Sequence, residues 1–179
     1  MAVEAAEVKT SENPMRNIAV AKIVLNIGVG KSGDVVDRAK RLLKELTGRE
    51  PTSRVAKQTV KNFGIHKGEP IGASVTLRGQ AAVDTLKRLL VAKSNRVNRS
   101  AFDRTGNCSF GVREHIEIPG MKYDPDIGIF GMDVSVVLER PGYRVARRRR
   151  AASKIGSKQK VTTEEAVEFF KNELKVEIV

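Results

Sequence analysis

The chain is poor in cysteine, in aromatic residues and in long apolar runs. Cys108 is its one cysteine, so no disulfide can form within the chain. It has no tryptophan, two tyrosines and six phenylalanines. The two histidines, His66 and His115, lack the spacing to Cys108 that structural zinc sites use, so we expect no metal and no cofactor. Apolar runs stay well below the roughly 20 residues of a membrane span, and we expect no membrane partner.

Acidic residues are also scarce relative to basic ones. The 179 residues include 33 lysines and arginines against 21 acids, a formal net charge of +12. Such an excess predicts a polyanionic partner, most often nucleic acid, and says little about fold. With 40% hydrophobic and 30% charged residues, the composition is that of a globular protein. We expect a flexible acidic leader over residues 1–13, which has no secretory or transit pattern, and one domain over 14–179 in a reducing compartment.

Periodicity of the apolar residues predicts the secondary structure. Alternation and β-forming residues indicate strands over 17–27, 52–60, 71–78, 109–118 and 132–138. Helical spacing indicates helices over 34–46, 80–92 and from about 162. Asp34 suits the first N-cap, Gly48 the position after that helix, and Thr162 with Glu165 a capping box. The order of elements predicts an α+β fold, a mostly antiparallel sheet with helices packed on one face and an open RNA-binding face.

Two nucleotide-binding patterns overlap in one turn. Gly28 to Gly33 fits G-x-G-x-x-G after a strand, but the acid that should end a second strand falls on Glu50, before Pro51. Gly30-Lys31-Ser32 resembles a P-loop, but Leu25 stands where that pattern needs glycine. A nucleotide-dependent enzyme is therefore disfavoured. A flexible turn, or a turn whose amides and Lys31 touch RNA phosphate, remains open.

Catalytic patterns are otherwise weak, and we expect no enzyme. Cys108 and His115 could form a thiolate–imidazole pair, but a buried neutral cysteine is the more common situation. Asp124 and Asp126 flank a proline and are expected to set a turn.

The segment 140–160 is the strongest electrostatic signal. It contains nine lysines and arginines and no acid. Arginine can bind phosphate in bidentate fashion, so we expect this basic segment to contact an RNA backbone. The alternative is a solvated tail. The expected contacts are Arg144, Arg147, Arg148, Arg149, Arg150 and Lys154.

One aromatic residue lies in a glycine-rich loop, where a core role is unusual. Phe63 stands beside His66 and Lys67, a combination that suits stacking on an unpaired base. The alternative is that Phe63 folds back under its own loop.

Several sequence blocks occur together and in order, and their set is more specific than any one of them. They are Asn13-Pro-Met-Arg-Asn17, Lys22-Ile-Val-Leu-Asn-Ile-Gly-Val-Gly30, Gly68-Glu-Pro-Ile-Gly72, Val75-Thr-Leu-Arg-Gly79, Gly106-Asn-Cys-Ser-Phe-Gly-Val-Arg-Glu-His115, Gly131-Met-Asp133 and Glu139-Arg-Pro-Gly142. From about Pro14 to Arg150 the chain resembles the large-subunit ribosomal protein five family, in its archaeal and eukaryotic form.

The resemblance implies a structural, cytoplasmic ribosomal protein that is monomeric within the ribosome. It implies binding of 5S rRNA and its attachment in the central protuberance, contact with large-subunit rRNA and P-site tRNA, and a bridge to a small-subunit protein partner. A non-ribosomal RNA chaperone is the remaining RNA-binding alternative. It would bind RNA with little preference for sequence or shape.

The resemblance also assigns residues. It matches an asparagine and a threonine of the family's RNA face to Asn26 and Thr76, and places Arg49 where the family often has glutamine. The expected 5S rRNA contacts are Arg16, Asn17, Asn26, Arg49, Thr76 and Arg78. The tRNA-approaching loop matches Asn62 to Glu69, with expected contacts Asn62, Phe63, Gly64, Ile65, His66 and Lys67.

Overall fold

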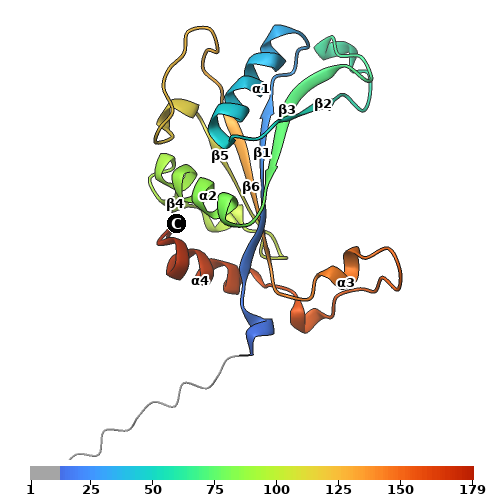
Figure 1. Cartoon of the computed structure of the whole chain (residues 1–179), viewed down its shortest axis with the longest axis vertical. Helices are drawn as coiled ribbons and strands as arrows, with labels where there is room; N and C mark the ends of the chain where they lie inside the picture. The colour runs from blue at the N-terminus through green and yellow to red at the C-terminus, as the bar shows by residue number, and fades with distance from the viewer. Residues whose placement is uncertain (1–12) are drawn as a thin grey trace, which may run out of the picture.

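A five-stranded antiparallel sheet forms the centre of the molecule, which confirms the α+β prediction (Figure 1). The computed structural model describes residues 13–179. The strand order is β2-β3-β1-β6-β5, so the first strand lies in the middle. The sheet strands are β1 (Ala19–Gly28), β2 (Thr52–Val55), β3 (Pro70–Leu77), β5 (Cys108–Val112) and β6 (Met132–Glu139). The helices are α1 (Asp34–Thr47), α2 (Gln80–Ala92), α3 (Arg144–Arg147) and α4 (Thr163–Leu174). Two short strands, β4 (Arg96–Val97) and β7 (Glu177–Ile178), pair in parallel.

Alternation along the strands gives the sheet one apolar face. In β1, Ile23, Leu25 and Ile27 are buried, whereas Val24 and Asn26 between them are partly exposed. The predicted alternation of β6 is likewise observed. α1 packs on β3 and α2 on β1, and their buried leucines join the same core. The face opposite this core carries the partly exposed side chains of the alternation, and we call it the open face.

The first helix begins and ends close to the predicted positions, with one difference at its start. Gly33 rather than Asp34 is the N-cap, and Asp34 occupies the first helical turn, where its carboxylate suits the helix dipole. Val36 is buried and Val35 is exposed, although Val35 shares the helical spacing of the buried Ala39, Leu42 and Leu46. Gly48 adopts φ +66°, and its amide donates a hydrogen bond to Lys44 O at 2.8 Å. This bond closes the helix at the predicted position.

The last helix confirms the capping box. Thr162 Oγ1 accepts from the Glu165 amide at 3.4 Å, and Glu165 Oε2 accepts from the Thr162 amide at 3.0 Å. Phe170 is fully buried and meets Phe102 edge-to-face, with ring centroids 5.1 Å apart. This aromatic contact joins α4 to the core.

Two predicted strands are shorter than expected. β2 ends at Val55 after a bulge, because the chain beyond it forms its own small hairpin with a Val60–Ile65 bridge. β5 ends at Val112, and His115 begins a short 3-10 turn whose first amide bonds Phe130 O at 3.0 Å. Ile118, the last residue of the predicted strand, lies beyond the end of β5 but is still buried. The prediction of a flexible leader falls almost wholly outside the described residues.

Candidate RNA-binding surface

Polar side chains form a row across the open face. Residues paired across antiparallel strands point to the same side, so the register defines which ones are neighbours. Asn26 on β1 is opposite Ser74 on one side and Asp133 on the other. Ser74 is in turn opposite Thr52 on β2. The row therefore spans four strands: Thr52, Ser74, Asn26 and Asp133.

Thr76 lies in the next row, where it is opposite Val24. It is a diagonal neighbour of Asn26, a relation that places the two side chains roughly 7–8 Å apart. Thr76 is exposed and Asn26 is half-buried. Within residues 13–179, neither side chain makes a hydrogen bond to the protein. Both polar groups are thus available to a ligand on the open face.

Arg54 is a candidate contact that the sequence did not identify. It lies on β2, opposite Gly72, and its Nε donates to Ser74 Oγ at 2.6 Å. This bond leaves the terminal nitrogens of the exposed guanidinium beside the polar row. Ser74 is only 3% exposed, so Arg54 is the more accessible of the two side chains. The alternation of β2 was the available signal, but the contact depends on strand pairing, which the sequence does not reveal.

The other predicted 5S rRNA contacts gather at one end of the sheet. β1 and β2 begin where β3 and β6 end, because these neighbours are antiparallel. Arg16 and Asn17 precede β1, Arg49 precedes β2, and Arg78 follows β3. All four are exposed. The structure thus brings them to the end from which the basic segment 140–160 leaves β6 (Figure 1).

The loop predicted to approach tRNA lies at the opposite end of the sheet (Figure 1). Phe63 is 74% exposed, so it does not fold back under its own loop. The loop is closed by two backbone hydrogen bonds: the Val60 amide donates to Ile65 O at 2.9 Å, and the Ile65 amide donates to Val60 O at 3.2 Å. Glu69 Oε2 accepts from the His66 amide at 2.9 Å, and Ser32 Oγ donates to the same carboxylate. These bonds hold the pKa of Glu69 below its usual value and fix the loop beside the glycine turn.

The glycine turn is not built to bind a pyrophosphate. The amides of Val29 and Gly30 both donate to Ile71 O, at 2.9 and 3.0 Å, so neither is free for a phosphate. The Glu69 carboxylate lies at the same turn and would repel an anion. β1 also has antiparallel neighbours on both sides, whereas a dinucleotide fold needs parallel crossovers. The same two amides are closed to RNA phosphate, whereas the Lys31 side chain is exposed there.

The arginines of the basic segment differ in how far they are already engaged. Arg147 pairs with Glu139, and Arg148 Nε donates to Ala151 O at 2.8 Å. In the part of the chain that the structure describes, no ion pair or side-chain hydrogen bond involves the remaining four predicted contacts, which are Arg144, Arg149, Arg150 and Lys154. These four are exposed and retain their full capacity to bind phosphate.

The base of the basic segment is closed by contacts with distant parts of the chain. Arg140 Nη2 donates to Glu165 Oε1 at 2.6 Å, and its Nη1 donates to Lys158 O at 3.2 Å. Gln159 Nε2 donates to Met15 O at 2.8 Å. Burial alone would raise the pKa of Glu165, but hydrogen bonds from Thr162 and Arg140 outweigh it and lower the pKa overall. The segment therefore leaves the domain from a fixed base.

Cys108 and His115 do not form a catalytic pair. Cys108 is fully buried, and this burial, with the nearby Asp103 carboxylate, raises the pKa of its thiol to about 12. His115 is also buried, and its Nδ1 accepts from the Phe130 amide at 3.3 Å. Asp124 Oδ1 accepts from the Asp126 amide at 2.9 Å, which confirms the predicted turn. None of these groups is placed for nucleophilic chemistry.

We expect Cys108 to resist alkylation in the folded protein. At pH 8 a thiol with a pKa near 12 is almost entirely protonated, and burial also excludes the reagent. Mass spectrometry after iodoacetamide treatment should show modification only when urea is added. Modification in native buffer at the rate of a free thiol would contradict this assignment.

Two other classes of site are absent from the described residues. Over residues 13–179, no group of three or more histidine, cysteine, aspartate or glutamate side chains is placed to hold a metal ion. In the same range, no helix has the length and hydropathy needed to cross a membrane.

Comparison with known proteins shows the family to which the chain is similar. Residues 13–66 match the family model described as Ribosomal protein L5, and residues 70–169 match the model of the C-terminus of the same ribosomal family. The chain is 55% identical over 166 residues to large ribosomal subunit protein uL5 of Pyrobaculum aerophilum, covering 93% of each chain. It is 49% identical over 170 residues to uL5 of Nitrosopumilus maritimus, covering 95% of this chain and 98% of the relative.

Proposed function

This chain belongs to the ribosomal protein L5 family, and from that premise we propose that its open face binds 5S rRNA. Family membership makes the protein a structural, non-enzymatic constituent of the large subunit of the cytoplasmic ribosome, with rRNA and ribosomal proteins as partners. The finer proposal concerns which RNA each surface meets. It assigns 5S rRNA to the open face, large-subunit rRNA to the basic segment and P-site tRNA to the loop 62–69, together with a bridge to the small subunit.

The availability of Asn26 and Thr76 is the observation that carries the proposal. These two side chains are diagonal neighbours on the open face and are not used by the protein itself over residues 13–179. An amide and a hydroxyl can bond ribose hydroxyls and base edges, which are the groups by which folded RNA is recognised. Arg49 and Arg78 at the end of the sheet can meet the flanking phosphates.

We expect Asn26→Ala and Thr76→Ala each to weaken 5S rRNA binding by about 1–2 kcal/mol, because each would leave an RNA group without its hydrogen bond. Filter binding with the full chain at fixed salt measures the affinity. A second RNA of equal length, unrelated to 5S rRNA, measures specificity. The variants should lose affinity for 5S rRNA and little for the unrelated RNA.

Asn98→Ala provides a matched control. Asn98 is an exposed amide outside the sheet, next to β4, so its removal should leave both affinities unchanged. Wild-type affinity of the Asn26 and Thr76 variants would remove these residues from the interface. Equal affinity of the wild-type chain for both RNAs would instead favour a chaperone that lacks shape preference.

The tRNA contact is supported by the exposure of Phe63 on a closed loop. Stacking of a base on an aromatic ring contributes on the order of 1–3 kcal/mol and does not require a particular base. Fixing the loop through Glu69 limits the entropy lost when the ring binds. Cross-linking from position 63 in ribosomes that carry P-site tRNA tests this assignment, which fails if only rRNA is labelled.

A further inference from the structure

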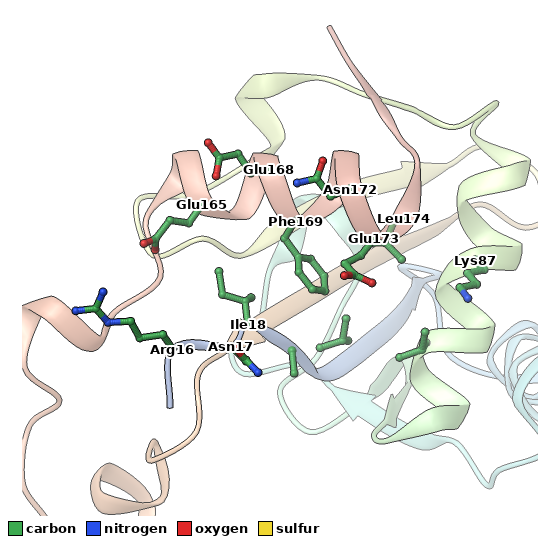
Figure 2. Close-up of a pocket in the computed structure, with 13 residues that line it drawn as sticks. Arg16, Asn17, Ile18, Lys87, Glu165, Glu168, Phe169, Asn172, Glu173 and Leu174 are labelled. Atoms are coloured by element: carbon green, nitrogen blue, oxygen red, sulfur yellow. The ribbon is translucent and has the colours of Figure 1, made fainter. Parts of the chain in front are cut away.

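A groove of about 790 Å³ is lined by residues at the start of β1, on helix α2 and on helix α4 (Figure 2). Its floor is apolar and includes Ile18 and Val20 at the start of β1. Val83 on α2 and Phe169 and Leu174 on α4 add to the apolar lining. Of the RNA contacts proposed above, Arg16 and Asn17 line this groove, and the others lie outside it.

The backbone of β1 has an unpaired edge in this groove. β6 pairs with β1 from Ala19 onward, but β3 pairs only from Ile23, because β3 ends at Leu77 and the chain then enters α2. On the β3 side, residues 17–21 therefore have no strand partner within the described part of the chain. This edge is roughly 16 Å long at 3.3 Å per residue. Exposed edges of this kind bind an added strand.

One face of α4 forms the wall opposite this edge. Glu165, Phe169 and Glu173 are spaced by four residues and so follow one stripe of the helix. Figure 2 shows the Phe169 ring and the Glu173 carboxylate extending from α4 toward β1, whereas Glu168 points away. Glu165 is already paired with Arg140. Glu173 makes no ion pair or side-chain hydrogen bond among the described residues.

We propose that this groove binds an extended segment of another protein, which adds as a strand along residues 17–21, at and just before the start of β1. The segment carries a lysine or arginine that pairs with Glu173 and apolar residues, two positions away on either side, that pack on Phe169 and Leu174. Side chains on one face of a strand repeat every two residues, so one segment can meet all three. The backbone edge supplies binding free energy, and the α4 stripe selects the sequence.

RNA is the weaker candidate for this groove. Arg16 and Lys87 also line the groove, but a phosphate backbone along the α4 wall would have to pass Glu168 and Glu173, whose charges repel it. The side chains of the apolar floor, Ile18, Val20 and Val83, offer no partner for ribose hydroxyls. The other possible occupant is the chain's own N-terminal segment, residues 1–12. That segment contains three glutamates and one lysine, so its charge does not complement Glu173.

Photo-cross-linking in intact large subunits tests the proposal. The full chain carries p-benzoylphenylalanine at position 169, a replacement close in shape to phenylalanine, and is assembled into subunits before irradiation. We expect a cross-link to one ribosomal protein, at a peptide that contains lysine or arginine. A cross-link to rRNA, a cross-link to residues 1–12 of the same chain, or no cross-link would overturn the proposal.

Charge reversal on the same helix gives a matched pair of variants in the cross-linking chain. Glu173→Lys should reduce the cross-link yield at least fivefold, whereas Glu164→Lys, on α4 but outside the groove, should change it less than twofold. Equal cross-link yields from the Glu173→Lys and Glu164→Lys chains would contradict the proposed contact of the bound segment with Glu173. 5S rRNA affinity of both charge variants should stay within twofold of wild type, which separates failure of this proposal from failure of the RNA assignment.

Discussion

Replacing Arg149 and Arg150 by alanine is expected to reduce the salt dependence of rRNA binding by about two in the slope of log affinity against log salt. Both side chains are exposed and unengaged among the described residues, so each can release one counterion when it meets a phosphate. Extending the change to Arg147 and Arg148 should reduce the slope by at most about four. The second pair should contribute less, because Glu139 and Ala151 O already occupy Arg147 and Arg148.

The measurement is fluorescence anisotropy of a labelled large-subunit rRNA fragment over a series of KCl concentrations. A double variant, Lys93→Ala with Arg104→Ala, removes the same charge from exposed positions outside the basic segment. This control should keep a slope close to wild type. If both double variants lower the slope equally, the effect reflects net charge, and the basic segment has no special contact with rRNA.

Replacing Arg140 by methionine is expected to lower the free energy of unfolding by roughly 2–3 kcal/mol. The side chain of Arg140 is only 10% exposed, and its loss leaves Glu165 without its partner and Lys158 O without its donor. The expected loss is below that of a fully buried pair, because Glu165 is 37% exposed and water screens part of the interaction. The buried Nε of Arg140 also has no partner in the native structure, which limits what the arginine contributes. Urea unfolding followed by circular dichroism measures the difference.

The effect of Arg140→Met should depend on pH. The folded pKa of Glu165 lies below its ordinary value of 4.5, so the carboxylate contributes stability above that value and loses it as the pH falls through the folded pKa. The gap in unfolding free energy between wild type and variant should therefore be largest near pH 7 and narrow below pH 4.5. Glu165→Gln preserves the capping geometry and should narrow the same gap at pH 7. A gap that is constant with pH would show that the pair is not responsible.

Elements with strong local signals were predicted well from the sequence. The capping box at Thr162 and Glu165, and the glycine after α1, are set by hydrogen bonds within one helical turn, so nearby residues specify them. The ends of β2 and β5 were not predictable in this way. Val55 ends its strand because of a bulge, and the chain beyond Val112 turns because His115 bonds to Phe130. Both causes involve contacts that periodicity does not encode.

In the candidate site, too, features set by nearby residues were predicted, and features set by contacts between distant residues were not. Charge identified the basic segment, the family resemblance assigned Asn26 and Thr76, and the structure places these two residues as neighbours on one face. The role of Arg54 beside Ser74 was missed, because strand pairing created that contact. Composition also could not separate the engaged Arg147 from Arg149, which has no partner among the described residues. Which donors are left over for a ligand is decided by the fold.

The central position of β1 has a consequence for synthesis of the chain. β1 is the first strand of the sheet to be made, yet one of its two partners, β6, ends at Glu139. Translation proceeds at roughly 5–20 residues per second, so one side of an apolar strand stays uncovered for seconds in the nascent polypeptide. Arg140 receives its partner Glu165 later still. Met15 O likewise has no donor until Gln159 has been synthesised. A chain terminated before Glu165 would thus lack the fixed base from which the basic segment leaves the domain.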